Sequence, residues 1–122
     1  MNPFGCDKLS VKRVFKMLEG LGLSRLESEV YVYLAKVGPS KVKDLSDGLR
    51  ITKYQVYPAL RSLKNKGIVA RRSESSALFS ALAFEEVLTL FMKLKTEKAK
   101  AIREAREEFV RSWQTMIKQK NT

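Results

Sequence analysis

A polar and basic segment in the middle of the chain carries side chains suited to contacting a nucleic acid. The candidate contact residues there are Thr52, Lys53, Tyr54, Gln55, Tyr57, Arg61, Arg71 and Arg72. Lysine and arginine bind phosphate, hydroxyl groups donate hydrogen bonds to it, and glutamine can read adenine through two hydrogen bonds. The segment therefore predicts contacts to both the backbone and the bases of a duplex.

Three further candidates lie upstream, at the expected start of a short helix. They are Ser40, Lys41 and Lys43. The first N–H groups of a helix have no partner within the helix and favour a phosphate. We therefore expect this turn to contact the DNA backbone as well.

Several of these residues also have a purely structural interpretation. Thr52 and Gln55 have the spacing of a capping box, in which each side chain accepts a hydrogen bond from the other residue's backbone N–H. Capping is the stronger expectation for Thr52, whereas Gln55 divides evenly between the cap and adenine. Arg71 and Arg72 point to alternate sides of a strand, so at most one of them faces DNA well. Arg61 fits a solvated face as well as a phosphate contact.

The charge of the chain indicates a polyanionic partner. The formal net charge is +11, from 24 basic and 13 acidic residues. Residues 51–82 have a net charge of +5, against +3 in each of the two longer flanking blocks. A surplus of this size indicates nucleic acid first and an acidic membrane surface second.

The residues that most catalytic and metal sites require are scarce. The chain has no histidine and a single cysteine, Cys6. The commonest general base is therefore missing, and one thiol forms neither an internal disulfide nor a zinc site. We expect no enzyme, no metal and no cofactor. No long apolar run marks a secretory signal or a membrane span, which predicts a cytoplasmic protein without a membrane partner.

Helical spacing of apolar residues organises the first half of the chain. It predicts a helix over residues 8–19 and another that begins at a capping box formed by Ser24 and Glu27. A Gly-Pro pair ends that helix. Ser40 is then expected to cap the next short helix.

A third helix and a hairpin complete the expected first domain. The helix runs from Thr52 to Lys66 and should persist through Pro58 with a local bend. Strands are expected at residues 68–72 and 77–82, joined by a polar turn at 73–76. Three helices followed by a basic hairpin are typical of a winged helix-turn-helix.

From about residue 84 the chain reads as one continuous helix almost to its end. A domain of this size cannot bury so long a helix, so we expect its apolar side to pair with a second copy of the chain. The candidate dimerisation residues are Phe91, Leu94, Ile102, Ala105, Phe109, Trp113 and Met116. The fold class is thus mainly α with a small β-hairpin, divided into a DNA-binding domain at 1–82 and a dimerising helix at 83–122.

An ordered set of short motifs supports this organisation. The set comprises Leu23-Ser24-x-x-Glu27, Glu29-Val30-Tyr31-x-Tyr33-Leu34, Gly38-Pro39-Ser40, Asp44-Leu45, Ile51-Thr52-Lys53, Val56-Tyr57-x-x-Leu60-x-x-Leu63 and Lys66-Gly67-Ile68-Val69. Over residues 20–94 it resembles the winged-helix domain of the TrmB-type archaeal transcriptional regulators. The stretch Val56-Tyr57-Pro58-Ala59-Leu60 also resembles PadR-type regulators. Either resemblance implies DNA binding and dimerisation through a C-terminal helix.

The resemblance stops short of the family's ligand domain. Full-length TrmB-type members carry a sugar-binding domain after the coiled coil, and this chain ends at Thr122. We therefore expect no carry-over of sugar sensing, and no small-molecule effector is evident.

Three functions remain open from the sequence. The first is a homodimeric regulator that reads duplex DNA with the third helix. The second is a chromatin-like protein that coats DNA without sequence preference. The third is a winged-helix adaptor that binds a protein partner within the transcription machinery. The concentration of positive charge in residues 51–82 favours the first two.

Overall fold

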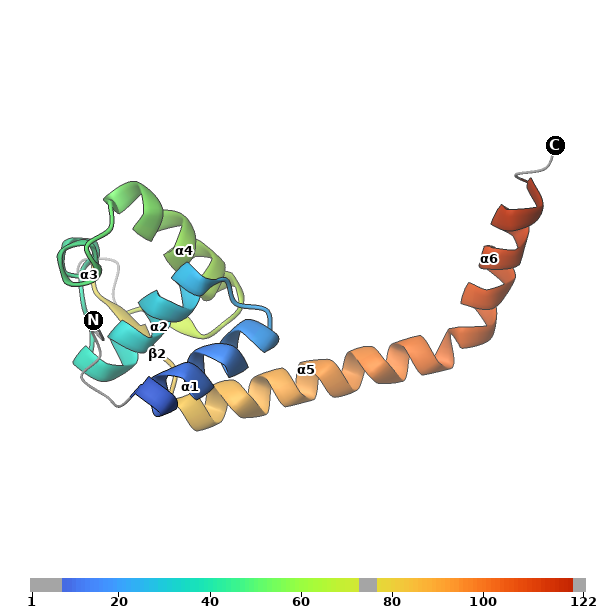
Figure 1. Cartoon of the computed structure of the whole chain (residues 1–122), viewed down its shortest axis with the longest axis horizontal. Helices are drawn as coiled ribbons and strands as arrows, with labels where there is room; N and C mark the ends of the chain where they lie inside the picture. The colour runs from blue at the N-terminus through green and yellow to red at the C-terminus, as the bar shows by residue number, and fades with distance from the viewer. Residues whose placement is uncertain (1–7, 73–76, 120–122) are drawn as a thin grey trace. The chain divides into compact units, whose positions relative to one another are not determined.

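The described residues form six helices and one two-stranded hairpin (Figure 1). The structure is a computed structural model, and it describes residues 8–72 and 77–119. In chain order the elements are α1 (Lys8–Gly20), α2 (Arg25–Val37), α3 (Val42–Leu49), α4 (Lys53–Asn65), β1 (Val69–Arg71), β2 (Phe79–Ala81), α5 (Phe84–Glu104) and α6 (Arg106–Gln119). The chain divides into two compact units after Val87, so the first turn of α5 belongs to the first unit.

The start of α2 is fixed by the expected capping box. The Ser24 hydroxyl oxygen accepts a hydrogen bond from the Glu27 N–H at 3.1 Å, and a Glu27 carboxylate oxygen accepts one from the Ser24 N–H at 2.8 Å. Two N–H groups that the helix cannot use are thereby satisfied. This prediction is confirmed.

The start of α3 differs from the prediction. Lys41 is the residue that precedes the helix, and its N–H donates to the Asp44 carboxylate at 3.0 Å. Ser40 instead pairs with Phe79 of the hairpin: each backbone N–H donates to the other's carbonyl, at 3.0 and 2.9 Å. The Ser40 hydroxyl donates to the Gly38 carbonyl at 2.9 Å. Ser40 is therefore a short extension of the sheet and not a helix cap.

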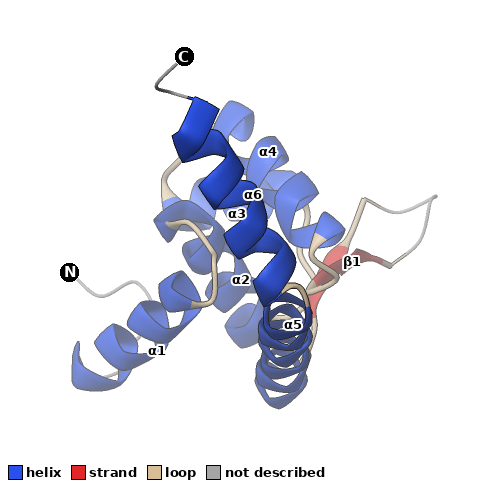
Figure 2. Ribbon diagram, turned by 90° about the vertical axis from the view of Figure 1, so that its right-hand side faces the viewer, coloured by secondary structure: helices blue, strands red, loops and turns tan. Residues whose placement is uncertain are grey.

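The core of the first unit is centred on α2, which packs against α1, α3, α4 and β2. Its buried residues come from all five helices that reach into the unit and from the start of the hairpin, and they include Phe15, Leu18, Val30, Tyr31, Leu34, Leu45, Val56, Leu63, Ile68 and Val87. Figure 2 shows α1 and β1 on opposite sides of this helical core. Burial of these apolar side chains is the main free-energy term that holds the unit together.

The helix α4 continues through Pro58, as expected. Beyond its end, Gly67 has a φ of 81°, a left-handed conformation that glycine adopts without a steric penalty. This residue turns the chain from α4 into the hairpin.

The hairpin is antiparallel, with Val69 opposite Ala81 and Arg71 opposite Phe79. Because Phe79 of β2 also pairs with Ser40, β2 lies between β1 and the segment that leads into α3. The predicted polar turn at 73–76 lies outside the described residues. Three helices and this hairpin together confirm the winged helix-turn-helix fold.

The C-terminal helix is interrupted, contrary to the prediction of one continuous helix. α5 ends at Glu104 and α6 begins at Arg106. Hydrogen bonds of helical spacing still join Ala105 to Ala101 and Phe109 to Ala105, at 3.1 and 2.9 Å. No proline or glycine lies near the break, so no composition signal marks it in the sequence.

Candidate nucleic-acid interface

The first turn of α4 projects an exposed set of polar and aromatic side chains. Val56, Leu60 and Leu63 are buried and anchor the helix, so its other side faces outward. Lys53, Gln55 and Arg61 are exposed there. Tyr54 is 88% exposed, an unusual position for a large aromatic ring. Tyr57 is half-exposed.

The capping box at the start of α4 is confirmed, and it occupies the Gln55 side chain. The Gln55 amide oxygen accepts from the Thr52 N–H at 3.0 Å, and the Thr52 hydroxyl oxygen accepts from the Gln55 N–H at 3.3 Å. The arrangement favours the structural interpretation of both residues, because a glutamine that reads adenine needs its oxygen directed at the base.

The start of α3 adds two of its three expected contact residues. Lys41 and Lys43 are exposed. Ser40 is only 2% exposed, and its hydroxyl is already bonded to Gly38, so it is not available to a duplex. Its burial follows from the pairing with β2, which joins segments far apart in the sequence.

A concave site lies where α3, α4 and the hairpin meet, and we call it the cationic hollow. Its volume is about 330 Å³, and its lining residues are Lys41, Val42, Lys43, Lys53, Tyr57, Arg71, Ala77 and Phe79. Four of these residues are basic and none is acidic. The structure thus brings together predicted contact residues from three separate elements.

Arg71, the last residue of β1, and Arg72, which follows the strand, are placed differently with respect to the cationic hollow. Arg71 is among its lining residues, whereas Arg72 is exposed outside it. The Arg72 N–H donates to the Leu78 carbonyl at 2.8 Å, which fixes the backbone at the end of the strand.

The far end of α4 is fastened to α2 by an ion pair that sequence reasoning missed. The Lys66 ammonium lies 3.3 Å from both carboxylate oxygens of Glu27 and 2.8 Å from the Ser62 hydroxyl. Burial alone would raise the pKa of Glu27, but hydrogen bonds from Ser62, the Ser24 backbone and Lys66 outweigh it and lower that pKa below 4.5. The capping glutamate of α2 therefore also positions α4.

The second unit exposes a row of large apolar side chains, which we call the apolar stripe. Its exposed members include Leu94, Ile102, Phe109, Trp113 and Met116. None of the residues of α6 is buried. Of the other two expected members, Ala105 is half-buried and Phe91 is only 6% exposed. Phe91 is thus already covered within the chain, and it does not belong to the stripe.

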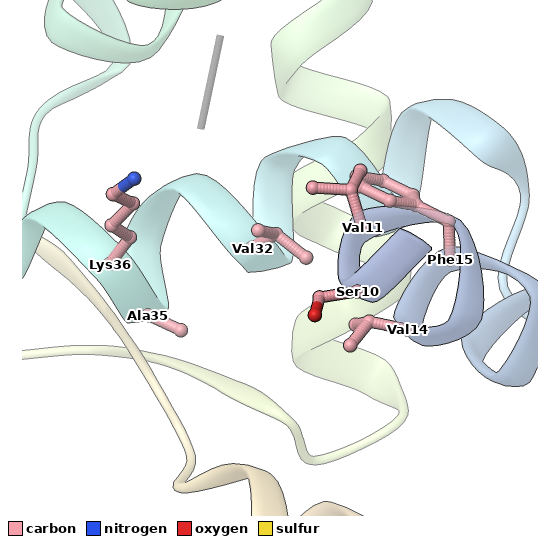
Figure 3. A pocket seen from close by; sticks show the side chains of 7 residues that line it. All are labelled: Ser10, Val11, Val14, Phe15, Val32, Ala35 and Lys36. Atoms are coloured by element: carbon pink, nitrogen blue, oxygen red, sulfur yellow. The ribbon is translucent and has the colours of Figure 1, made fainter. Parts of the chain in front are cut away.

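A second hollow, of about 280 Å³, lies between α1 and α2 (Figure 3). Val11, Val14 and Phe15 line it from α1, and Val32, Ala35 and Lys36 line it from α2. Its lining is almost entirely apolar, in contrast to the cationic hollow.

Two further features are absent from the described residues. Within residues 8–72 and 77–119, no cluster of three metal-ligating side chains occurs. Over the same residues, no helix has the length and apolar character needed to cross a membrane.

Comparison with known proteins bears on the family and the fold of the chain. Residues 18–85 match the family model described as sugar-specific transcriptional regulator TrmB. Over 58 residues the chain is 36% identical to the HTH-type sugar sensing transcriptional regulator TrmBL1 of Pyrococcus furiosus. That match covers 48% of this chain and 17% of the relative, so the chain spans only a small part of the relative's length.

A solved structure shows the same fold. The YusO protein of Bacillus subtilis superimposes with a TM-score of 0.51 at 19% sequence identity, covering 94% of this chain and 92% of that protein. At this identity the likeness extends to the fold alone.

Proposed function

Because this chain belongs to the TrmB family of transcriptional regulators, we propose that it binds double-stranded DNA as a homodimer. In this proposal α4 enters the major groove, and the hairpin contacts the flanking backbone or minor groove. The apolar stripes of two copies pair, which sets the distance between the two half-sites near 34 Å or a multiple of it.

The observation that carries the proposal is the convergence of cations beside a projecting helix. Lys41, Lys43, Lys53 and Arg71 reach the cationic hollow from α3, α4 and β1. Positive charge gathered from several elements next to an exposed helix start is what phosphate contacts beside a groove require. The exposed Tyr54 adds a ring that can contact base edges or the thymine methyl group.

Within this proposal the residues of α4 divide into two roles. Thr52 and Gln55 hold the start of the helix. Lys53 and Tyr54 project from that start and supply base discrimination, while Tyr57 and Arg61 contact phosphates from the flank.

The homodimer rests on the apolar stripe. Its side chains have no cover within the described chain, and an exposed row of this kind marks an interaction surface. A second copy presents the same row, so one symmetric contact would cover both.

Selection of bound duplexes from a random DNA pool tests the proposal. We expect an enriched motif with two-fold symmetry, and a complex of two chains per duplex by light scattering. Competition with random duplex then measures the preference, expected at about 1,000-fold or more. Equal affinity for the selected duplex and for random duplex would contradict the proposal, because attraction by net charge alone does not distinguish between sequences.

The hydrogen bond between the Thr52 N–H and the Gln55 side chain favours a second candidate function, that of a protein that coats DNA with little sequence preference. The Gln55 amide oxygen is used in the helix cap, which removes the most specific base reader among the predicted residues. The same competition experiment separates the two candidates. Random duplex would displace the selected duplex from a coating protein at nearly the same concentration as the selected duplex itself does.

A further inference from the structure

The cationic hollow has the dimensions of a small-molecule site. Its volume of about 330 Å³ lies within the range of ligand pockets, which begins near 300 Å³. A single phosphate group would fill only a small part of this space. A duplex backbone, which presents one phosphate at a time, therefore leaves much of the hollow unused.

The walls combine two chemistries. Lys41, Lys43, Lys53 and Arg71 supply positive charge, whereas Val42, Ala77 and Phe79 supply apolar surface. Tyr57 adds a further ring together with a hydroxyl group. A ligand that matches both kinds of wall carries a phosphate on an apolar or aromatic body, since cations hold the phosphate and rings hold the body.

The charge of the hollow is not cancelled by the acid at the start of α3. Asp44 accepts a hydrogen bond from the Lys41 backbone N–H at 3.0 Å and does not line the hollow. Among the lining residues that the structure describes, none is a carboxylate, so an anion entering the hollow meets the exposed ammonium groups of Lys41, Lys43 and Lys53.

We propose that the cationic hollow binds a free phosphate ester of about the size of a 5′-mononucleotide, and that this ligand competes with duplex DNA. The chemistry shared by the two ligands is the phosphate ester, which a DNA backbone and a small molecule both supply. The competition rests on the proposed function, because it requires the same lysines to contact DNA. Binding of the free ester does not depend on it.

Calorimetry with adenosine 5′-monophosphate tests the site directly. We expect saturable binding to the full chain, weaker binding of inorganic phosphate, which lacks the aromatic body, and none of adenosine, which lacks the phosphate. The variants Lys43→Ala and Lys53→Ala should each weaken binding about 10-fold, since each removes one charge-assisted contact. Lys12→Ala, which removes an exposed lysine of α1 outside the hollow, should leave binding unchanged.

Two results would overturn the site. One is a calorimetric signal of the mononucleotide that potassium chloride reproduces at equal ionic strength. The other is an equal loss of binding in Lys12→Ala. Because all three lysines are exposed, unchanged thermal midpoints should verify that the variants remain folded.

Titration of the protein–duplex complex with the mononucleotide completes the test. Displacement of the duplex at the concentration that saturates the hollow is expected, and a ternary complex would refute the competition. Duplex binding without mononucleotide binding would refute this inference alone. Mononucleotide binding without duplex binding would refute the proposed function and leave the site standing.

Discussion

The hydroxyl of Tyr31 in α2 donates a hydrogen bond of 2.7 Å to the backbone carbonyl of Leu82, at the exit from the hairpin. The Tyr31 side chain is buried, and burial, with a smaller contribution from the charge of Glu85, raises its pKa to about 12. This bond fastens the end of the hairpin to the central helix of the first unit, and it therefore helps to hold the hairpin beside α4.

Replacing Tyr31 by phenylalanine should reduce the free energy of unfolding by about 1 kcal/mol, because the Leu82 carbonyl loses its partner. The variant should also lose the part of the pH dependence of its unfolding free energy that arises from the Tyr31 hydroxyl. The folded pKa of about 12 lies above the ordinary 10.0, so the unfolded state loses this proton first. Tyr31 thus contributes stability that is complete below pH 10 and is lost as the pH rises toward 12. Denaturant unfolding across this range measures both effects, and identical alkaline curves for the two proteins would refute the assignment.

The ion pair between Glu27 and Lys66 predicts a loss of stability in acid. The pKa of Glu27 is lowered in the folded state, so its contribution is present above about 4.5 and disappears as the pH falls through the folded value. In the Glu27→Gln variant, the free energy of unfolding should therefore depend less steeply on pH in this acidic range than it does in the wild type. Glu97→Gln, an exposed substitution on α5, is the matched control and should retain the wild-type slope.

Loss of the two adjacent arginines at the end of β1 should weaken binding to every DNA sequence. For Arg71→Ala with Arg72→Ala we expect the slope of log K against log salt to fall by about 1 to 2, since each phosphate contact contributes about 0.9. Fluorescence anisotropy at several salt concentrations measures this slope. The double variant Lys12→Ala and Lys16→Ala removes the same charge from exposed positions of α1. If it lowers the slope equally, the hairpin is not a specific part of the contact surface.

Substitution of the apolar stripe should separate the two copies. With Phe109→Ser and Trp113→Ser we expect light scattering to give the mass of one chain at concentrations where the wild type gives two. Both side chains are exposed in the protomer, so the first unit should keep its thermal midpoint. Arg111→Ser, on an exposed position of the same helix, is the control. A double variant that remains dimeric would place the contact elsewhere.

Two substitutions can distinguish the capping role of Gln55 from a base-reading role. Gln55→Ala removes the cap and should cost about 1 kcal/mol of stability, whereas Gln55→Glu keeps the accepting oxygen and should cost much less. We expect Gln55→Ala to select the same DNA motif as the wild type. A changed motif would show that Gln55 reads a base after all.

Local signals in the sequence predicted the local structure well. The capping boxes at Ser24 and Thr52 form as expected, because the groups that make them lie three residues apart and need no other element. The turn at Gly67 follows from its tolerance of positive φ.

Contacts between residues far apart in the sequence could not be predicted from these local signals. Ser40 has the composition of a helix cap, but its pairing with Phe79 depends on a strand almost forty residues later. The Lys66–Glu27 ion pair joins residues equally distant in sequence. The spacing Lys41-x-x-Asp44 was the one local sign that the helix begins a residue later, since the aspartate can cap the Lys41 N–H. The break at Ala105 carries no such sign.

The two backbone hydrogen bonds between Ser40 and Phe79 have a mechanical consequence. They join β2 to Ser40, two residues before α3 begins at Val42. In the proposed complex, a duplex that pushes on the hairpin would therefore also act on α3 through these two backbone hydrogen bonds. The hairpin and α3 should tilt together as one lever when DNA bends against them.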